Sequence, residues 1–380
     1  MKKLICALLV LLLLLLCLAA CDGNGSRIDE PAQSTSAAAE AFLPDSEGVT
    51  ITETSAESEA SRPSLAWSTA FRSRKVPTGS FYMDEIAFYQ INDDDSVTIV
   101  NVPKAKIEQF SKKQDTLPRC RYYERFMDPA LLELLPILDY ALENGYTRFS
   151  VPTSSFNGGM ITNYSHELTR TYRINGESIY GLSVTTVEAG DAAWDCVLVS
   201  VPELEDPKVM KRYKRALKAA KRIVAEMPKG LNEYERALYL YEYLTQNVSY
   251  NYFVGSEDLL YNALIKGMTV ENGFTDALYC LYNLTGIECI AQEGWYLGRD
   301  GAATWGEARI DGEWYLFDPC YEVLMRTDGL EYFGISDTKL QILSPREVTA
   351  YDKEHCPRCP RDLLRPVGSL NIQRKGLTPV

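Results

Sequence analysis

The stretch MTVENGFTDALYCLYNL at residues 268–284, together with TWGEARIDGEWYLFDP at residues 304–319, decides the fold. The first has apolar residues at Ala277, Leu278, Leu281 and Leu284, a spacing of three and four that predicts a helix beginning near Glu271. The second consists of two apolar runs separated by Asp311-Gly312, a pair typical of a tight β-hairpin turn. This part of the chain is therefore predicted to be a helix followed by antiparallel strands.

The residues upstream and between these stretches extend the pattern. Asn232 followed by Glu235 predicts a capped helix start, with the helix running to about Gln246. A second short helix, from Glu257 to Ile265, is predicted to stop at Lys266-Gly267. After the third helix, a strand is expected from Cys289 to about Tyr296. Residues 206–360 are thus predicted to contain helices followed by an antiparallel sheet.

This order of elements resembles the bacterial transglutaminase-like domain, a papain-like α+β fold. The motifs that carry the resemblance are Glu-Arg-Ala at 235–237, VSYNY at 248–252, the turn at Gly267, Gly273-Phe274, TGIEC at 285–289, DGEWYLFD at 311–318 and YFGISD at 332–337. The resemblance implies helices packed on an antiparallel sheet over residues 206–360. A smaller α+β domain is expected before it, at 77–205.

In the family that this sequence resembles, a Cys-His-Asp triad carries out acyl transfer. Aligning Gly273-Phe274 with the family's motif puts Glu271 at the cysteine position, and aligning Trp305 puts Ala303 at the histidine position. Asp318 matches the aspartate. Glutamate cannot form a thiolate, and alanine cannot carry a proton. The resemblance therefore implies a degenerate triad in which only Asp318 is retained.

Three functions remain open at this level. The first is a non-catalytic module that binds a peptide or a cell-wall or envelope component in a groove lined by Glu271, Trp305 and Asp318. The second is a hydrolase in which Glu271 and Asp318 work as paired carboxylates. Against it, a helix N-terminus at Glu271 favours the ionised form, which cannot donate a proton. The third is a structural protein of an envelope assembly.

The first 21 residues predict export. Lys2 and Lys3 precede an apolar run that ends in Leu-Ala-Ala-Cys21, the pattern of a secretory signal. The run also resembles the lipobox of bacterial lipoproteins, which implies cleavage after residue 20 and a lipid on Cys21. We therefore expect a protein anchored by lipid to the outer face of the membrane, an uncleaved signal anchor being the alternative. Residues 21–76 are rich in Ser, Ala and acidic side chains and are predicted to be a disordered linker.

Within residues 77–205, strands are predicted at 81–91 and 96–102, a helix from Asp128 to Asn144, and a strand at 196–201. The helix that starts at Asp206-Pro207 carries basic residues along one face, between Lys211 and Arg222. That face is expected to be solvated or, alternatively, to contact an anionic partner. Residues 361–380 are expected to be a tail.

Charge and composition limit the partners and cofactors. A net charge of −13 argues against nucleic acid as a partner. The chain has two histidines, His166 and His355, and both lie outside the predicted site strands. HCPRC at 355–359 has the Cys-x-x-Cys spacing of zinc sites, but no second Cys/His pair is nearby. No metal and no cofactor are therefore expected, and the motif is interpreted as a turn or a reducible disulfide.

Overall fold

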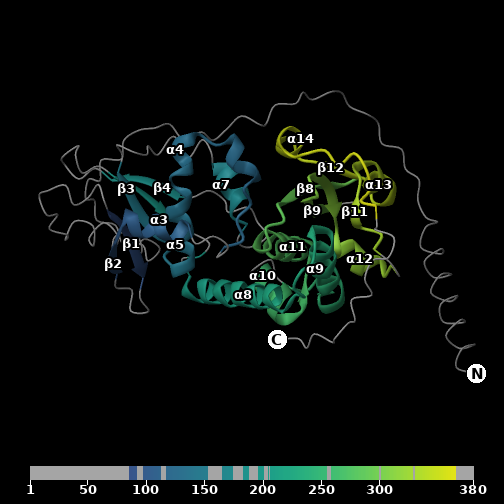
Figure 1. Cartoon of the computed structure of the whole chain (residues 1–380), viewed down its shortest axis with the longest axis horizontal. Coiled ribbons are helices and arrows are strands. Elements are labelled where there is room, and N and C mark those ends of the chain that lie inside the picture. Colours follow the sequence, from purple (N-terminus) through teal and green to yellow (C-terminus); the bar gives the residue numbers. More distant parts are fainter. Residues whose placement is uncertain are drawn as a thin grey trace, which may run out of the picture. The chain divides into compact units, whose positions relative to one another are not determined.

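Two five-stranded antiparallel sheets organise the part of the chain that the structure describes, each with its own set of helices (Figure 1). The computed structural model describes residues 85–91, 97–112, 117–152, 165–173, 183–187, 196–200, 204, 206–254, 258–298, 301–327 and 330–364. All of these belong to one unit of the chain, residues 59–380. The predicted signal, lipidation site and linker lie outside the described residues, and so does the tail beyond residue 364. None of the helices described here has the length and apolar character needed to span a bilayer.

The first sheet has the strand order β2-β1-β3-β5-β4. Its strands are β1 (Glu85–Ile91), β2 (Val97–Pro103), β3 (Arg148–Pro152), β4 (Ser183–Val187) and β5 (Cys196–Ser200). The predicted strands at 81–91 and 96–102 are confirmed over β1 and β2, which pair with Phe88 opposite Val100. The predicted strand at 196–201 is confirmed as β5. The short strands β3 and β4 were not predicted.

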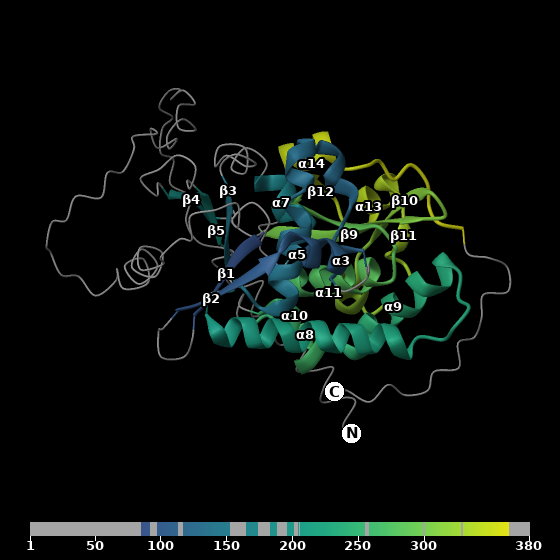
Figure 2. The same ribbon diagram turned by 60° about the vertical axis from the view of Figure 1, so that its left-hand side comes forward.

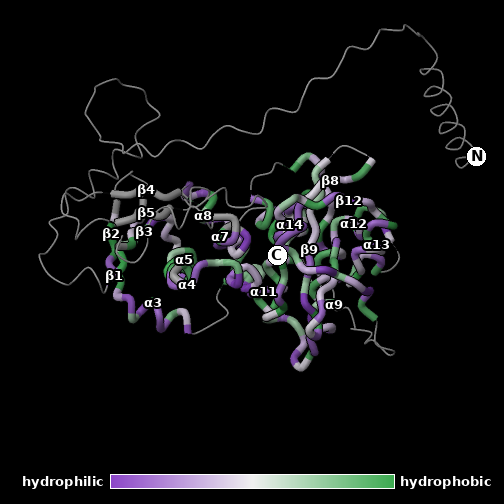
Figure 3. The backbone as a smooth tube through the Cα atoms, turned by 90° about the horizontal axis from the view of Figure 1, so that it is seen from above, coloured by the Kyte–Doolittle hydropathy of each residue, from purple (hydrophilic) through white to green (hydrophobic). Residues whose placement is uncertain are grey.

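The helices described in this part of the chain lie between the strands of the first sheet in sequence. They are α3 (Lys104–Ser111), the 3-10 helix η2 (Tyr122–Phe126), α4 (Pro129–Leu132), α5 (Leu135–Asn144) and α7 (Ser165–Thr171). α3 is mostly hydrophilic in Figure 3, and Ile107 is its buried residue. The single helix predicted from Asp128 to Asn144 is wrong in one respect, because it is split into α4 and α5. Pro136 has no N–H to donate to the carbonyl of Leu132, so the first helix ends at Leu132 and the next begins at Leu135, with the proline in its first turn.

The second sheet has the order β11-β10-β9-β8-β12. Its strands are β8 (Cys289–Tyr296), β9 (Ala302–Ile310), β10 (Glu313–Phe317), β11 (Phe333–Ile335) and β12 (Arg346–Val348). The predicted hairpin is confirmed: Asp311 and Gly312 both have positive φ, 49° and 88°, as a type I′ turn requires. The edge strands β11 and β12 were not predicted.

Helices α8 (Pro207–Glu226), α9 (Glu233–Asn247), α10 (Leu259–Tyr261) and α11 (Glu271–Leu284) pack together, and α8 lies alongside α10 and α11 in both views (Figures 1 and 2). The capping box at Asn232 and Glu235 is confirmed. The second predicted helix is α10 continuing into a π-helical turn, η5 (Asn262–Lys266), which ends at Gly267 in the left-handed conformation (φ 67°). The short parallel pair β6 (Ser249–Tyr250) and β7 (Met268–Thr269) connects these helices.

After β10 the chain adds α12 (Pro319–Met325), α13 (Asp337–Leu343) and α14 (Ala350–His355). α11 packs against β8 and β9, and Gly306 permits the contact, because a Cβ there would lie 2.5 Å from Leu278 Cδ2. The hydrophobic core of this part of the chain therefore lies between α11 and the central strands β8 and β9.

The basic face of α8 is only partly solvated. Lys221 pairs with Glu143 at 3.0 Å, and Lys214 Nζ donates to the carbonyl of Asn144 at 3.1 Å. Arg212 pairs with Asp258 at 2.5 Å. The expectation of a solvated face is confirmed for the exposed residues Lys211, Lys214, Arg215, Lys218 and Arg222. Arg212 and Lys221 are half-buried and pair with carboxylates of the same chain.

The close approach of β8 and β12 explains why residue 294 is a glycine. This residue of β8 pairs with Val348 of β12, and a Cβ on it would lie 2.1 Å from the backbone oxygen of Glu347. We expect Gly294→Ala to separate the two strands and lower the free energy of unfolding by about 1–3 kcal/mol. Urea denaturation measures this loss. Glu347→Ala, an exposed change on the partner strand β12, is the control and should stay within about 0.5 kcal/mol of the wild type.

Candidate functional site

Glu271 is the first residue of α11, and its side chain is half-buried. Tyr250 Oη donates a hydrogen bond to Glu271 Oε1 at 3.0 Å. Burial and the neighbouring carboxylate raise the pKa of Tyr250, so its hydroxyl keeps the proton that it donates. The positive end of the helix dipole also favours a negative charge at this position. The Glu271 side chain is therefore fixed by Tyr250 at the N-terminus of α11.

Ala303 and Trp305 lie on β9, and each is 1% exposed. They belong to a cluster of buried side chains that also contains Tyr296, Leu316, Tyr321, Tyr332, Ile335, Leu340 and Cys359. At residue 303, which the sequence comparison predicts to be the histidine position, the chain thus has a methyl group packed in an apolar cluster. No proton carrier is present at that point of the strand.

Asp318 ends β10 and caps α12, and it is 2% exposed. Its Oδ1 accepts a hydrogen bond from the backbone N–H of Tyr321 at 2.8 Å. Its Oδ2 accepts one from Arg346 Nη2 at 2.5 Å. Both carboxylate oxygens are therefore occupied inside the protein.

Arg346, from β12, is the residue that sequence reasoning missed. Its guanidinium carbon lies 5.0 Å from the Trp305 ring, 5.2 Å from Tyr296 and 4.8 Å from Tyr321, which is cation–π distance. Burial lowers the pKa of Arg346 and the Asp318 carboxylate raises it, with a net upward shift. A permanently protonated guanidinium cannot act as a base. Arg346 lies 28 residues after Asp318 on a strand of three residues, so no local signal pointed to it.

Of the predicted groove residues, only Glu271 reaches solvent. Trp305 and Asp318 are joined through Arg346, and Glu271 is bonded to Tyr250. A cavity of the described residues lies elsewhere, lined among others by Arg119, Asp139, Asn283 and Glu288, and contains none of the three.

The other thiols and the imidazole of His355 do not supply the missing groups. Cys280 in α11 and Cys320 in α12 are each 1% exposed, and burial raises the pKa of Cys280. His355 stacks on Tyr351 with ring centroids 4.1 Å apart. His166 is in α7, and its side chain lies outside the described part. Cys356 and Cys359 are free thiols, so the disulfide considered for this motif is wrong.

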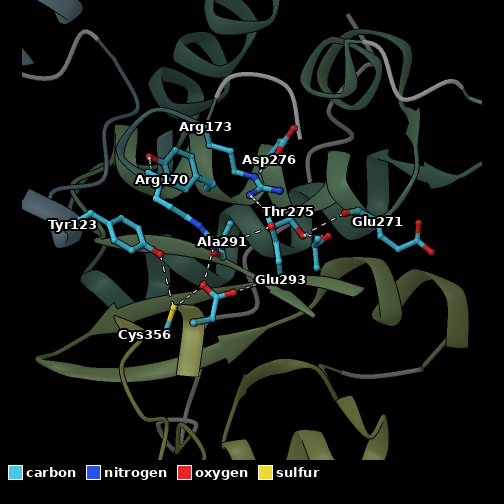
Figure 4. A network of polar contacts seen from close by, with 12 residues as sticks. Tyr123, Arg170, Arg173, Glu271, Thr275, Asp276, Ala291, Glu293 and Cys356 are labelled. Carbon is cyan, nitrogen blue, oxygen red and sulfur yellow. Dashed lines mark hydrogen bonds and ion pairs between the residues drawn. The ribbon is translucent and has the colours of Figure 1, made fainter. Parts of the chain in front are cut away.

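A second buried network joins α7 to α11 and β8 (Figure 4). Arg173 Nε donates to Asp276 Oδ1 at 2.5 Å, and Arg173 Nη1 lies 3.2 Å from Glu293. Arg170 Nη1 donates to the carbonyl of Ala291 at 2.8 Å and pairs with Asp352 at 3.0 Å. These ion pairs are charged crosslinks between residues more than 100 positions apart in the sequence.

The carboxyl of Asp276 makes stability depend on pH. Burial raises the pKa of Asp276 to about 6, and Arg173 opposes the shift. Between about 4, the value in an unfolded chain, and 6 the native state holds more protons than the unfolded state. The free energy of unfolding contributed by this group therefore falls as pH rises through this window and is level above it.

We expect Asp276→Asn to remove this part of the pH dependence. Urea denaturation of wild type and variant at pH 4, 5, 6 and 7 measures the difference between their profiles. Asp311→Asn, an exposed change in the hairpin turn, is the control. If the free energy of unfolding varied with pH in the same way in Asp276→Asn and in the wild type, Asp276 would not be the group that binds the proton.

Comparison with known proteins agrees with the fold. Residues 220–319 match the family model described as the transglutaminase-like superfamily. No curated protein sequence matches the chain. Among solved structures it is similar to a proposed cysteine protease from Cytophaga hutchinsonii, with 16% identity and a TM-score of 0.26 over 38% of this chain and 64% of that one.

Another similar structure is a proposed protease from Parabacteroides distasonis, with 15% identity and a TM-score of 0.24 over 34% of this chain and 29% of that one. The periplasmic domain of TgpA from Pseudomonas aeruginosa gives 15% identity and a TM-score of 0.23 over 38% of this chain and 64% of that one. The chain thus spans less than two thirds of each of these relatives. Its helices, its antiparallel sheet and the family match together show that the chain contains a transglutaminase-like domain.

Proposed function

We propose that the protein is an exported, lipid-anchored envelope protein whose transglutaminase-like domain binds a peptide or another envelope component without cleaving or joining it. The observation that carries the proposal is the ion pair of Asp318 with Arg346 inside the Trp305, Tyr296 and Tyr321 rings. Arg346 Nη2 thus takes an oxygen of Asp318, the residue that the resemblance aligns with the family's aspartate. With alanine at 303 and glutamate at 271, these two positions offer neither a thiol nucleophile nor an imidazole base.

The proposed contact surface is around Glu271. Tyr252 and Phe253 are 78% and 94% exposed, and they follow β6, whose partner β7 leads into Glu271. The backbone N–H of Asn251 donates to the carbonyl of Thr269 at 2.8 Å, which holds this segment beside α11. A carboxylate at the start of α11, with exposed aromatic rings on the neighbouring segment, suits a peptide that carries an ammonium group.

Trp305 and Asp318 have a different role in this proposal. Both are buried, so they hold β9, β10 and β12 together through Arg346 rather than touch the ligand. Of the three residues predicted to line a groove, only Glu271 is therefore proposed to contact the ligand.

The test uses the detergent-solubilised full chain incubated with purified cell envelope. Mass spectrometry follows the protein in the pellet and any fragments newly released. We expect the wild type to bind without releasing fragments, and Glu271→Gln to bind about tenfold more weakly, a loss of ~1.4 kcal/mol. Glu354→Gln, an exposed carboxylate on α14, is the control and should bind like the wild type.

Fragments released by the wild type but not by Glu271→Gln would overturn the proposal in favour of a hydrolase. The engagement of both Asp318 oxygens already argues against paired carboxylate catalysis. Absence of the protein from the pellet would reject the binding module and leave the structural role in an envelope assembly.

A further inference from the structure

A cluster of potential metal ligands lies on the face of β9 opposite α11. Gly306 faces α11, and the next residue, Glu307, points to the other face of the strand. The cluster consists of Glu307 of β9, Asp337 at the start of α13, and Cys359 after α14. One oxygen of each carboxylate and the Cys359 sulfur all lie within 4.8 Å of one another. Three elements that are distant in sequence therefore converge on one point.

The carboxylate of Glu307 is unusual because it is buried without a hydrogen-bond partner among the described residues. It is 0% exposed, and neither carboxylate oxygen has a hydrogen-bond partner among the described residues. The Gln292 side chain approaches and favours the ionised form, but outside the geometry of a hydrogen bond. An unpaired carboxylate at this depth is costly, so it needs a proton or a cation.

The other two ligands are fixed toward it by the backbone. The N–H of Cys359 donates to Asp337 Oδ2 at 3.0 Å, and the N–H of Asp337 donates to the carbonyl of Cys359 at 2.8 Å. Cys359 is 0% exposed and Asp337 is half-buried. This reciprocal pair holds a thiol and a carboxylate side by side in front of Glu307.

The charges that surround the cluster are mostly negative. Burial, Asp337 and Asp352 raise the pKa of Glu307, and Arg358 and Gln292 oppose the shift. Burial also raises the pKa of Cys359, with Glu307 and Asp337 adding to the effect. The cluster thus carries an excess of acidic groups, whose charge a divalent cation would balance.

We propose that Glu307, Asp337 and Cys359 bind a zinc ion. Sulfur argues against Mg²⁺ and Ca²⁺, which take six or more oxygen ligands, whereas zinc accepts sulfur and oxygen in four-coordinate sites. Binding displaces the protons of the Cys359 thiol and the Glu307 carboxyl, so two protons leave as Zn²⁺ enters. Three protein ligands leave one coordination position for water.

The proposed site differs from a Cys-x-x-Cys zinc knuckle. Cys356 Sγ donates to Asp352 Oδ1 at 3.5 Å and lies 3.9 Å from Tyr123 Oη, so it is engaged outside the cluster (Figure 4). The carboxylates come from β9 and α13 instead, which no local spacing indicates. The bound ion would pin the segment after α14 onto the sheet.

The experiment uses the full chain, purified in detergent, stripped with a chelator and titrated with Zn²⁺ in competition with a chromophoric chelator. We expect one zinc per chain. Co²⁺ in its place should give a thiolate-to-cobalt charge-transfer band. Glu307→Gln and Cys359→Ser should weaken zinc binding at least 100-fold, and Cys359→Ser should abolish the band. Cys356→Ser is the matched control and should keep both.

A wild-type chain that binds no zinc, or binds Co²⁺ without the thiolate band, would overturn the proposal. Unchanged zinc affinity in Cys359→Ser, or loss of the band in Cys356→Ser, would do the same. If the buried variants fail to fold, Asp337→Asn at the half-buried position takes their place, and unchanged affinity in that variant would also contradict the site.

Discussion

Replacing Arg346 with alanine is expected to lower the free energy of unfolding by about 3–5 kcal/mol, because it leaves a buried aspartate without its counter-ion. The side chains of Arg346 and Asp318 are 0% and 3% exposed, so water cannot take the place of the guanidinium without opening the structure. The Trp305, Tyr296 and Tyr321 rings lose a packed cation at the same time. Urea denaturation followed by circular dichroism measures the loss.

Two further variants test whether the loss in Arg346→Ala comes from the buried ion pair. Arg361→Ala breaks an exposed ion pair with Glu313, whose side chains are 62% and 48% exposed, and should cost less than about 1 kcal/mol. The double variant Arg346→Met with Asp318→Asn removes both charges and should recover most of the stability. Equal losses for Arg346→Ala and Arg361→Ala would contradict a buried pair.

A second large loss is expected for Arg173→Ala. This arginine joins α7 to Asp276 of α11, with side chains 3% and 1% exposed, and it also contacts Glu293. Removing it strands a buried carboxylate, at a cost of about 3–5 kcal/mol. The same denaturation experiment reports the change, and it also tests whether α7 is held to α11 by this charge pair.

The control for Arg173 is Lys353→Ala, which breaks an exposed pair with Glu347, 57% and 56% exposed. It should change the free energy of unfolding by less than about 1 kcal/mol. Combining Arg173→Met with Asp276→Asn should restore most of the loss. A cost below 1 kcal/mol for Arg173→Ala alone would mean that water reaches Asp276 and that the network is not a crosslink.

Arg346 and Arg173 affect the proposed function indirectly, because each fixes elements of the domain that carries the proposed binding surface. Arg346 keeps Asp318 occupied and β12 on the edge of the sheet. Arg173 keeps α11, which begins with Glu271, against the helix from the first part of the chain. The proposed binding surface therefore rests on a scaffold that is fixed by buried charge pairs.

Local features of this fold were readable from the sequence. The capping box at Asn232, the stop at Gly267 and the turn at Asp311-Gly312 each depend on the dihedral preferences and hydrogen bonds of a few consecutive residues. The same is true of the helix at 271–284, which has enough turns to show its apolar period. The break at Pro136 was equally local and was missed.

The site chemistry was decided by tertiary structure. The strands β11 and β12 have three residues each, too few for any periodicity. The pairing of Asp318 with Arg346 and the meeting of Glu307, Asp337 and Cys359 join residues from different elements. The sequence alone predicted which residues align with the family's triad, and it located the helix and the hairpin strands that carry them. Only packing decided their neighbours, because contacts between distant residues follow from how whole elements bury their apolar faces, which no local preference specifies.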